Sequence, residues 1–143
     1  MPTPTEFPAR GKVLEINGRT VVFHPANTTY RTHLGIASGL TVTTDRLLDA
    51  IIRLSARKVW TVISGGLFVA PIFGPPRIVQ GRVRYLDERQ LVHNAGVNVL
   101  VELPNSDAAY DLARGPIEVG ALVNASVLPG ATFELVTEAA RSR

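Results

Sequence analysis

The chain has no cysteine among its 143 residues. This absence excludes a disulfide framework, a zinc–thiolate site, a thiol nucleophile and a redox-active cysteine motif. Stability therefore has to come from packing, and the length is sufficient for one domain with a real hydrophobic core. Hydrophobic residues make up 45% and charged residues 19% of the sequence, which is the balance of a globular protein rather than a disordered one.

Long apolar runs are also missing from the start of the chain. The first twenty residues contain Pro2, Pro4 and Pro8 and no continuous apolar stretch, so the sequence predicts neither a secretory signal nor a membrane span there. We therefore expect a cytoplasmic protein with no membrane partner. Lysine is scarce, with Lys12 and Lys58 as its two occurrences, and a formal net charge of +3 is weak evidence for nucleic-acid binding.

The sequence patterns that carry known chemistry are lacking. His24, His33 and His93 form no H-x-x-x-H or H-E-x-x-H pair, so no metal site is expected. His24 precedes Pro25, which is typical of an exposed turn. The serines lack a G-x-S-x-G pattern, the glycines form no phosphate loop, and a hydrolase with paired carboxylates would need two of the scattered acids to meet in the fold. We expect a non-enzymatic protein with no catalytic residue and no cofactor.

The sequence does contain an internal similarity. The segment GKVLEINGRTVVFH begins at Gly11, and GRVRYLDERQLVHN begins at Gly81, 70 positions later. Residues 46–52 resemble residues 121–127 at a displacement of 75, which implies a five-residue insertion. We interpret the chain as one domain with two repeat units, 11–63 and 81–137, a connector, 64–80, and flexible tails, 1–9 and 138–143. Similar hairpins that recur without duplication are the alternative.

Each unit is predicted to begin with a hairpin, because Asn17-Gly18 suits a type I′ turn and Asp87-Glu88 occupies the matching place. Further strands are predicted at 28–34, 58–63, 97–103 and 132–136. Residues 44–57 have helical spacing, but their partner segment 121–128 has the pattern of a strand, so we expect a strand. The predicted fold is all-β: a small closed or partly open β-barrel from two repeated β-units with a pseudo-twofold relation.

The connector, residues 64–80, reads SGGLFVAPIFGPPRIVQ and mixes large apolar residues with prolines and glycines. Loops are normally polar, so these side chains are expected to plug the barrel, to line a ligand groove or to contact another protein. Our first hypothesis is a module of unknown specific function that acts through protein contacts, as a homo-oligomer or with a protein partner. The candidate interface residues are Leu67, Phe68, Ile72, Phe73 and Arg77.

The alternative hypothesis is a small barrel that binds single-stranded nucleic acid through stacking and phosphate contacts. It depends on a basic stretch that is interleaved with an aromatic residue. Aromatic residues amount to only 6% of the chain, and core packing is the competing role for them. The candidate residues for this alternative are Arg53, Arg57, Lys58, Trp60, Arg82 and Arg84.

Overall fold

The computed structural model describes residues 3–36 and 44–136. These residues form an almost wholly β structure, with twelve strands in one sheet and two 3-10 helices of a single turn. The expected tail 138–143 and the expected end of the second unit at 137 lie outside the described residues. In chain order the elements are η1 (Pro4–Glu6), β1 (Ala9–Asn17), β2 (Thr20–Pro25), β3 (Arg31–Ile36), β4 (Leu47–Val62), β5 (Phe68–Ala70), β6 (Phe73–Gly74), β7 (Ile78–Leu86), β8 (Gln90–Asn94), β9 (Asn98–Glu102), η2 (Asp107–Ala109), β10 (Tyr110–Asp111), β11 (Leu122–Val127) and β12 (Thr132–Leu135).

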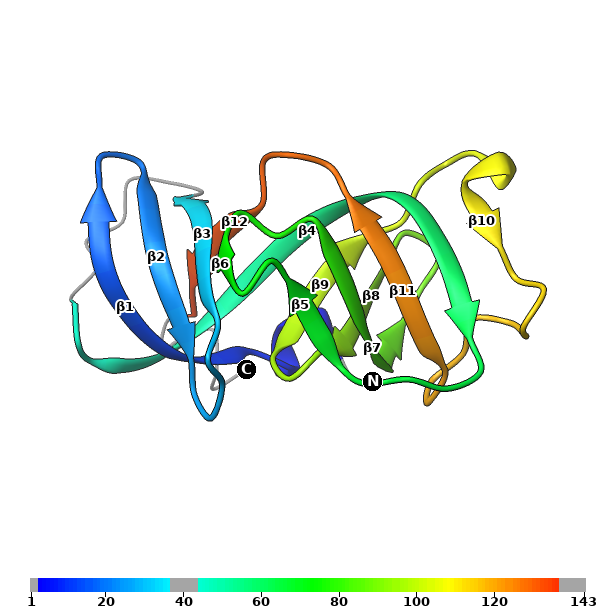
Figure 1. The fold of residues 1–143 in the computed structure, drawn as a ribbon, viewed down its shortest axis with the longest axis horizontal. Coiled ribbons are helices and arrows are strands. Elements are labelled where there is room, and N and C mark those ends of the chain that lie inside the picture. The colour runs from blue at the N-terminus through cyan, green and yellow to red at the C-terminus, as the bar shows by residue number, and fades with distance from the viewer. Residues whose placement is uncertain (1–2, 37–43, 137–143) are drawn as a thin grey trace.

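Strand β4 is sixteen residues long and runs diagonally through the whole molecule (Figure 1). Its first part pairs with β1 and β12, and its second part pairs with β9, β10 and β11. The expectation of a strand rather than a helix in residues 44–57 is confirmed from Leu47 onward. The separate strand expected at 58–63 is wrong, because these residues continue β4.

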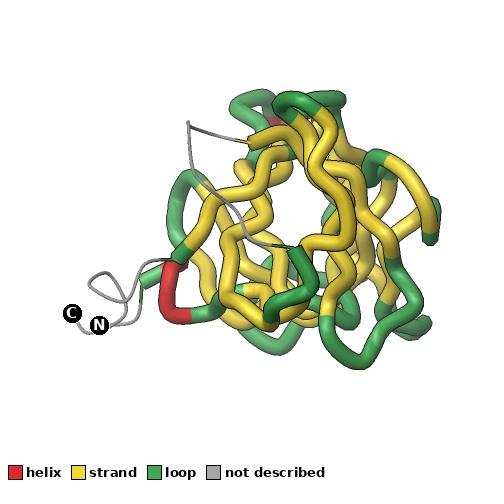
Figure 2. The backbone as a smooth tube through the Cα atoms, turned by 90° about the vertical axis from the view of Figure 1, so that its left-hand side faces the viewer, coloured by secondary structure: helices red, strands yellow, loops and turns green. Residues whose placement is uncertain are grey.

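The strand pairings form two rings that share β4. In the first ring, β1 pairs with β2, β2 with β3, β3 with β12, β12 with β4, and β4 with β1. In the second ring, β7 pairs with β8, β8 with β9, β9 with β4, β4 with β11, and β11 with β7. A view along the long axis shows the strands curling around an interior (Figure 2).

Short strands continue the edges that the rings leave open. Strand β5 pairs with the start of β7, where β8 does not reach, and β6 pairs with the start of β3, where β12 does not reach. Strand β10 pairs with β4 beyond the end of β9. Covering such edges removes unpaired backbone donors and acceptors that would otherwise template pairing with another chain.

The interior is apolar and continuous across the two rings. Twenty-two buried residues form the main core cluster, and in the first ring the rings of Phe23 and Phe133 pack with centroids 5.4 Å apart. A second small cluster of Ile51, Val92 and Leu100 is separate from it. No helix in the part of the chain that the structure describes has the length and apolar character needed to cross a membrane.

The third strand of the first unit starts later than the sequence predicts, at Arg31 rather than at residue 28. Local hydrogen bonds explain the difference. The hydroxyl of Thr28 donates to the carbonyl of Pro25 and accepts from the amide of Tyr30, and Asn27 has a positive φ of 62°. These residues therefore form a turn, which competes with strand pairing.

The first hairpin of each ring has the same register. Strands β1 and β2 pair Val13 with Phe23, and strands β7 and β8 pair Val83 with His93, so each residue of the second pair lies 70 positions after its counterpart. A bulge follows Val13 in one ladder and Val83 in the other. Strand pairing therefore aligns the same segments that the sequence similarity aligns.

A second correspondence lies on the neighbouring pairs of strands. Arg10 of β1 faces Asp49 of β4, and Gln80 of β7 faces Asn124 of β11. The first pair forms an ion pair with an N–O distance of 3.4 Å, and in the second pair the Asn124 side-chain amide donates to Gln80 Oε1 at 2.9 Å. The same cross-strand position thus holds a polar pair in each ring.

Gly11 and Gly81 also occupy one position in this correspondence, and both lie against a carbonyl of the next strand. A Cβ on Gly11 would lie 2.4 Å from the carbonyl oxygen of His24, and one on Gly81 would lie 2.4 Å from that of Asn94. The clashing atoms belong to the backbone of a paired strand, which cannot move aside as a flexible side chain can. We expect Gly11→Ala and Gly81→Ala each to lower the free energy of unfolding by about 1–3 kcal/mol, as overpacking does, in chemical denaturation. Gly66→Ala, whose Cβ would meet nothing within 4 Å, is the control, and an equal loss in it would contradict this explanation.

Candidate functional site

The connector of residues 64–80 adds two short strands to the edges of the sheet, ends within β7, and bridges the two rings. Its strand β5 pairs with β7 of the second ring, and its strand β6 pairs with β3 of the first (Figure 1). Val69 is buried, but most of the segment is exposed. The connector is therefore hydrogen-bonded to both rings.

The structure brings most of the predicted interface residues to this surface. Leu67 is 42% exposed, Ile72 50% and Phe73 64%. Arg77 is also exposed, whereas Phe68 is half-buried. From the sequence, these side chains were expected to plug the barrel, to line a ligand groove or to contact another protein. The exposed fractions of Ile72 and Phe73 argue against the plug.

Tyr30 holds the connector in place. Its hydroxyl donates to the carbonyl of Ala95 at 3.1 Å and accepts from the amide of Val69 at 3.2 Å. Tyr30 comes from the first repeat unit, Val69 from the connector and Ala95 from the second unit. One side chain therefore joins these three parts of the chain. The sequence contained no signal for this contact, because its members lie 39 and 65 positions apart.

A cation accompanies the most exposed aromatic residue of the connector. The guanidinium of Arg31 lies 5.7 Å from the centre of the Phe73 ring, within the range of a cation–π interaction. Arg31 is itself exposed. An aromatic and an arginine side by side are the residue types that dominate binding energy at protein interfaces.

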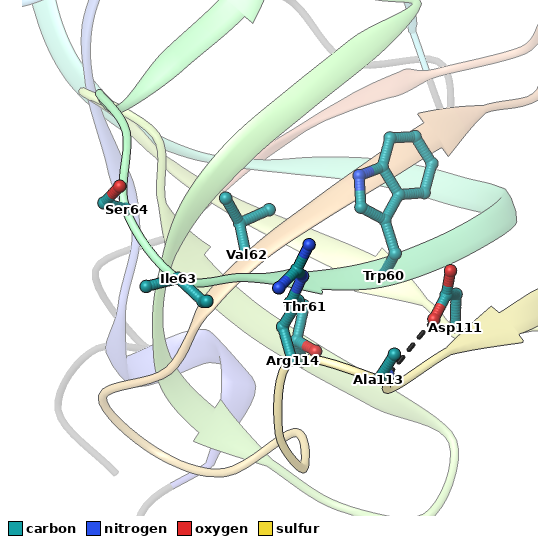
Figure 3. Close-up of a pocket in the computed structure, with 8 residues that line it drawn as sticks. All are labelled: Trp60, Thr61, Val62, Ile63, Ser64, Asp111, Ala113 and Arg114. Carbon is teal, nitrogen blue, oxygen red and sulfur yellow. Dashed lines mark hydrogen bonds between the residues drawn. The ribbon is translucent and has the colours of Figure 1, made fainter.

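The second candidate surface lies on the outer face of β4 and β11. Trp60, Asp111 and Arg114 line one hollow together with residues 61–64 and Ala113 (Figure 3). Arg57, Lys58 and Ser126 line the adjoining hollow, which shares Trp60 and Asp111 with the first. In Figure 3 the side chain of Arg114 extends across β4 beside Trp60.

The structure brings three of the six predicted nucleic-acid residues together at these hollows, namely Arg57, Lys58 and Trp60. The other three arginines have partners elsewhere: Arg53 contacts Glu134 at 3.4 Å, Arg82 donates to the carbonyl of Gly120, and Arg84 lies over the ring of Phe7.

The other lining residues of the two hollows were not predicted, and three of them carry a charge or a hydroxyl from a different element: Asp111, Arg114 and Ser126. Asp111 lies opposite Trp60 because β10 pairs in parallel with β4. The two strands are far apart in the sequence, so local patterns could not predict this pairing. Arg114 lies in a segment rich in turn residues, so the sequence indicates a loop there. Nothing in the sequence indicates that this loop lies against Trp60.

Three expectations about turns can be checked directly. The type I′ turn expected at Asn17-Gly18 is wrong, because Asn17 pairs with Thr20, which leaves Gly18-Arg19 as the loop, and of these two residues Gly18 has the positive φ, 64°. The Asp87 carboxylate accepts from the amides of Arg89 and Gln90 and from the Tyr85 hydroxyl, so the turn predicted at Asp87-Glu88 is confirmed. The Tyr85 hydrogen bond is the main reason that the pKa of Asp87 is lowered. The exposed turn expected at His24 is wrong, because His24 lies within strand β2, half-buried, with Nε2 2.7 Å from the carbonyl oxygen of Thr28.

No protein-family model matches the chain, and no curated protein and no solved structure resembles it closely enough to count as a relative. Within residues 3–36 and 44–136, no three histidine, aspartate or glutamate side chains gather where they could hold a metal ion. Function therefore has to be argued from the two surfaces themselves.

His93 is fully buried in the second ring, and burial lowers its pKa to about 4, an effect that the backbone of Val123 offsets only in part. The imidazole is therefore neutral in the folded protein at pH 7. In the unfolded chain it gains a proton near pH 6.5. The contribution of His93 to the free energy of unfolding is therefore largest above pH 6.5. It decreases as the pH falls from 6.5 to 4 and is constant below that.

Phe23 occupies the position of His93 in the first ring. We expect His93→Phe to abolish that part of the acid sensitivity, worth about 3 kcal/mol between pH 6.5 and 4, in urea denaturation curves recorded across this range. His33→Gln, at an exposed position, should keep the wild-type dependence. An unchanged acid slope in His93→Phe would show that other groups cause it.

Proposed function

We propose that this protein is a non-enzymatic binding module that acts through protein contacts and associates with a second copy of itself through the connector. The exposed hydrophobic residues carry the proposal. Ten large hydrophobic side chains are exposed in the described part of the chain, and five of them lie between residues 63 and 78. These five are Ile63, Leu67, Ile72, Phe73 and Ile78.

The way the connector is held supports this role. Strands β5 and β6 are paired with β7 and β3, and Tyr30 fixes the amide of Val69. A surface that is already ordered loses less conformational entropy on binding than a free loop does. Ile72 and Phe73 are therefore presented in one arrangement, which favours a specific contact over general stickiness.

The charges around the connector fit an interface with an apolar centre and a polar rim. Residues 64–80 contain one charged side chain, Arg77, and no carboxylate. Charged residues are depleted at the centre of protein interfaces, and arginine and aromatic residues are enriched. In a two-fold dimer both copies use the same patch. Ile72 and Phe73 of each copy would therefore be buried in the interface.

We further propose that the two rings are two small β-barrels that arose by duplication, with β4 contributing a strand to each. The matching register, the bulges after Val13 and Val83, and the close approach at Gly11 and Gly81 support it. In this arrangement the connector is the part without a counterpart. A segment that duplication does not account for is a suitable place for a binding surface.

Size-exclusion chromatography with light scattering tests the self-association. We expect the wild-type chain to have twice the monomer mass at high micromolar concentration. The double variant Ile72→Asp, Phe73→Asp should elute as a monomer, with dimerisation weakened at least about 30-fold, because hot-spot losses are about 2 kcal/mol or more.

Val119→Asp is the matched control. Val119 is 66% exposed and Phe73 is 64% exposed, so Val119→Asp is matched to the single variant Phe73→Asp, and each places one carboxylate at an equally accessible apolar position. The control should dimerise as the wild type does. A wild-type chain that stays monomeric throughout the concentration series would refute self-association, as would equal loss in the control.

A further inference from the structure

The hollows beside Trp60 belong to one continuous outer face of the sheet. Strand register places Gln80, Asn124, Trp60 and Asp111 in a row across β7, β11, β4 and β10. Gln80 and Asn124 are buried, and Gln80 Nε2 donates to the carbonyl of Gly66 in the connector, so the open part of the row is Trp60 and Asp111. Neighbouring residues such as Val59 and Ala125 belong to the buried core. Because side chains alternate along a strand, Trp60 points away from that core.

Basic side chains lie along this face. We use the term basic trough for Arg57, Lys58, Trp60, Asp111, Arg114 and Ser126. The hollow at Arg57 and Ser126 continues to a third hollow that is lined by Arg77. Along β4 the distance from Arg57 to Val62, which line the two ends of the adjoining hollows, is about 17 Å at ~3.3 Å per residue, so the pair of hollows is elongated rather than round.

Among the residues that the structure describes, no ion pair neutralises the cations of the trough. In the part of the chain that the structure describes, ion pairs join Arg10 to Asp49 and Arg53 to Glu134, and neither includes a trough residue. Arg57 donates to the hydroxyl of Ser126 at 3.1 Å, which orients the guanidinium and leaves its charge in place. Three cations, Arg57, Lys58 and Arg114, thus share these hollows with one carboxylate, that of Asp111. Arg77 lines the third hollow, which Asp111 does not line.

Trp60 is the aromatic residue at the centre of this arrangement. It is half-buried, so part of the indole is open to the hollows on both sides. An indole on a sheet surface offers a flat platform on which a base can stack, and such stacking tolerates any base. The cations beside it are suited to phosphate groups, which arginine binds through two parallel hydrogen bonds.

We infer that the basic trough binds a single strand of nucleic acid, with a base stacked on Trp60 and the flanking phosphates held by Arg57, Lys58 and Arg114. A single strand offers unpaired bases and a line of phosphates, and both are needed to use an aromatic platform inside an elongated basic groove. A duplex shields its bases in the stack. This binding goes beyond the contact proposed for the connector, which uses Ile72 and Phe73.

Trp60 is the only tryptophan in the chain, so its fluorescence reports on this site alone. We expect a pyrimidine oligonucleotide of about 12 nucleotides to quench it on titration at low salt. Fluorescence anisotropy of the same labelled oligonucleotide should give the affinity. Raising the salt should weaken binding, with a slope of about 0.7 for each phosphate contact in a single strand.

Lys58 and Lys12 provide a matched pair, because they are the only lysines in the chain and both are exposed. Lys58→Ala should weaken binding and lower the salt slope by about 0.7. Lys12→Ala changes the net charge equally but lies on β1 and should leave both quantities unchanged. Trp60→Ala should weaken binding about 5- to 150-fold, and Trp60→Phe should retain part of it.

Four results would overturn the inference. These are no binding at low salt, binding without a change in Trp60 fluorescence, equal effects of Lys58→Ala and Lys12→Ala, and equal affinity for a duplex or for heparin. The last result would indicate general attraction of polyanions. If Trp60→Ala does not fold by circular dichroism, the lysine pair and the salt slope decide the question with folded variants.

Discussion

Strand β4 is the constraint on which the rest of the structure depends. Its sixteen residues supply one strand to each ring of the sheet, so its register sets the position of five other strands. A change of one residue in its pairing would turn every side chain to the opposite face. The first ring, the second ring and the trough beside Trp60 all take their place from this one strand.

The packing between the rings explains why β4 resembles a helix in sequence. Ile52 and Ala50 belong to the main core, whereas Ile51 packs with Val92 and Leu100 in the separate small cluster. Both faces of this part of the strand are therefore buried. Apolar residues at neighbouring positions give a spacing that fits a helix as well as a strand buried on both sides.

The connector and the trough illustrate two different uses of the outside of the sheet. Around the connector, apolar side chains remain exposed although their backbone is paired with β3 and β7. Along the trough, alternation on β4 and β11 turns the polar and aromatic side chains outward while Val59 and Ala125 fill the core. Both surfaces lie on hydrogen-bonded strands, β5 and β6 for the connector and β4 and β11 for the trough.

Local patterns were enough to predict the strand-rich class and the hairpin turn at Asp87, because turns and alternation depend on neighbours in the chain. They also marked the connector as unusual, since its apolar content is visible in the residues themselves. Tertiary structure alone decided that β4 serves both rings, that Tyr30 joins the connector to Ala95, and that Arg114 lies beside Trp60. These contacts join residues tens of positions apart, and closing such loops depends on the packing of the whole sheet rather than on any local preference.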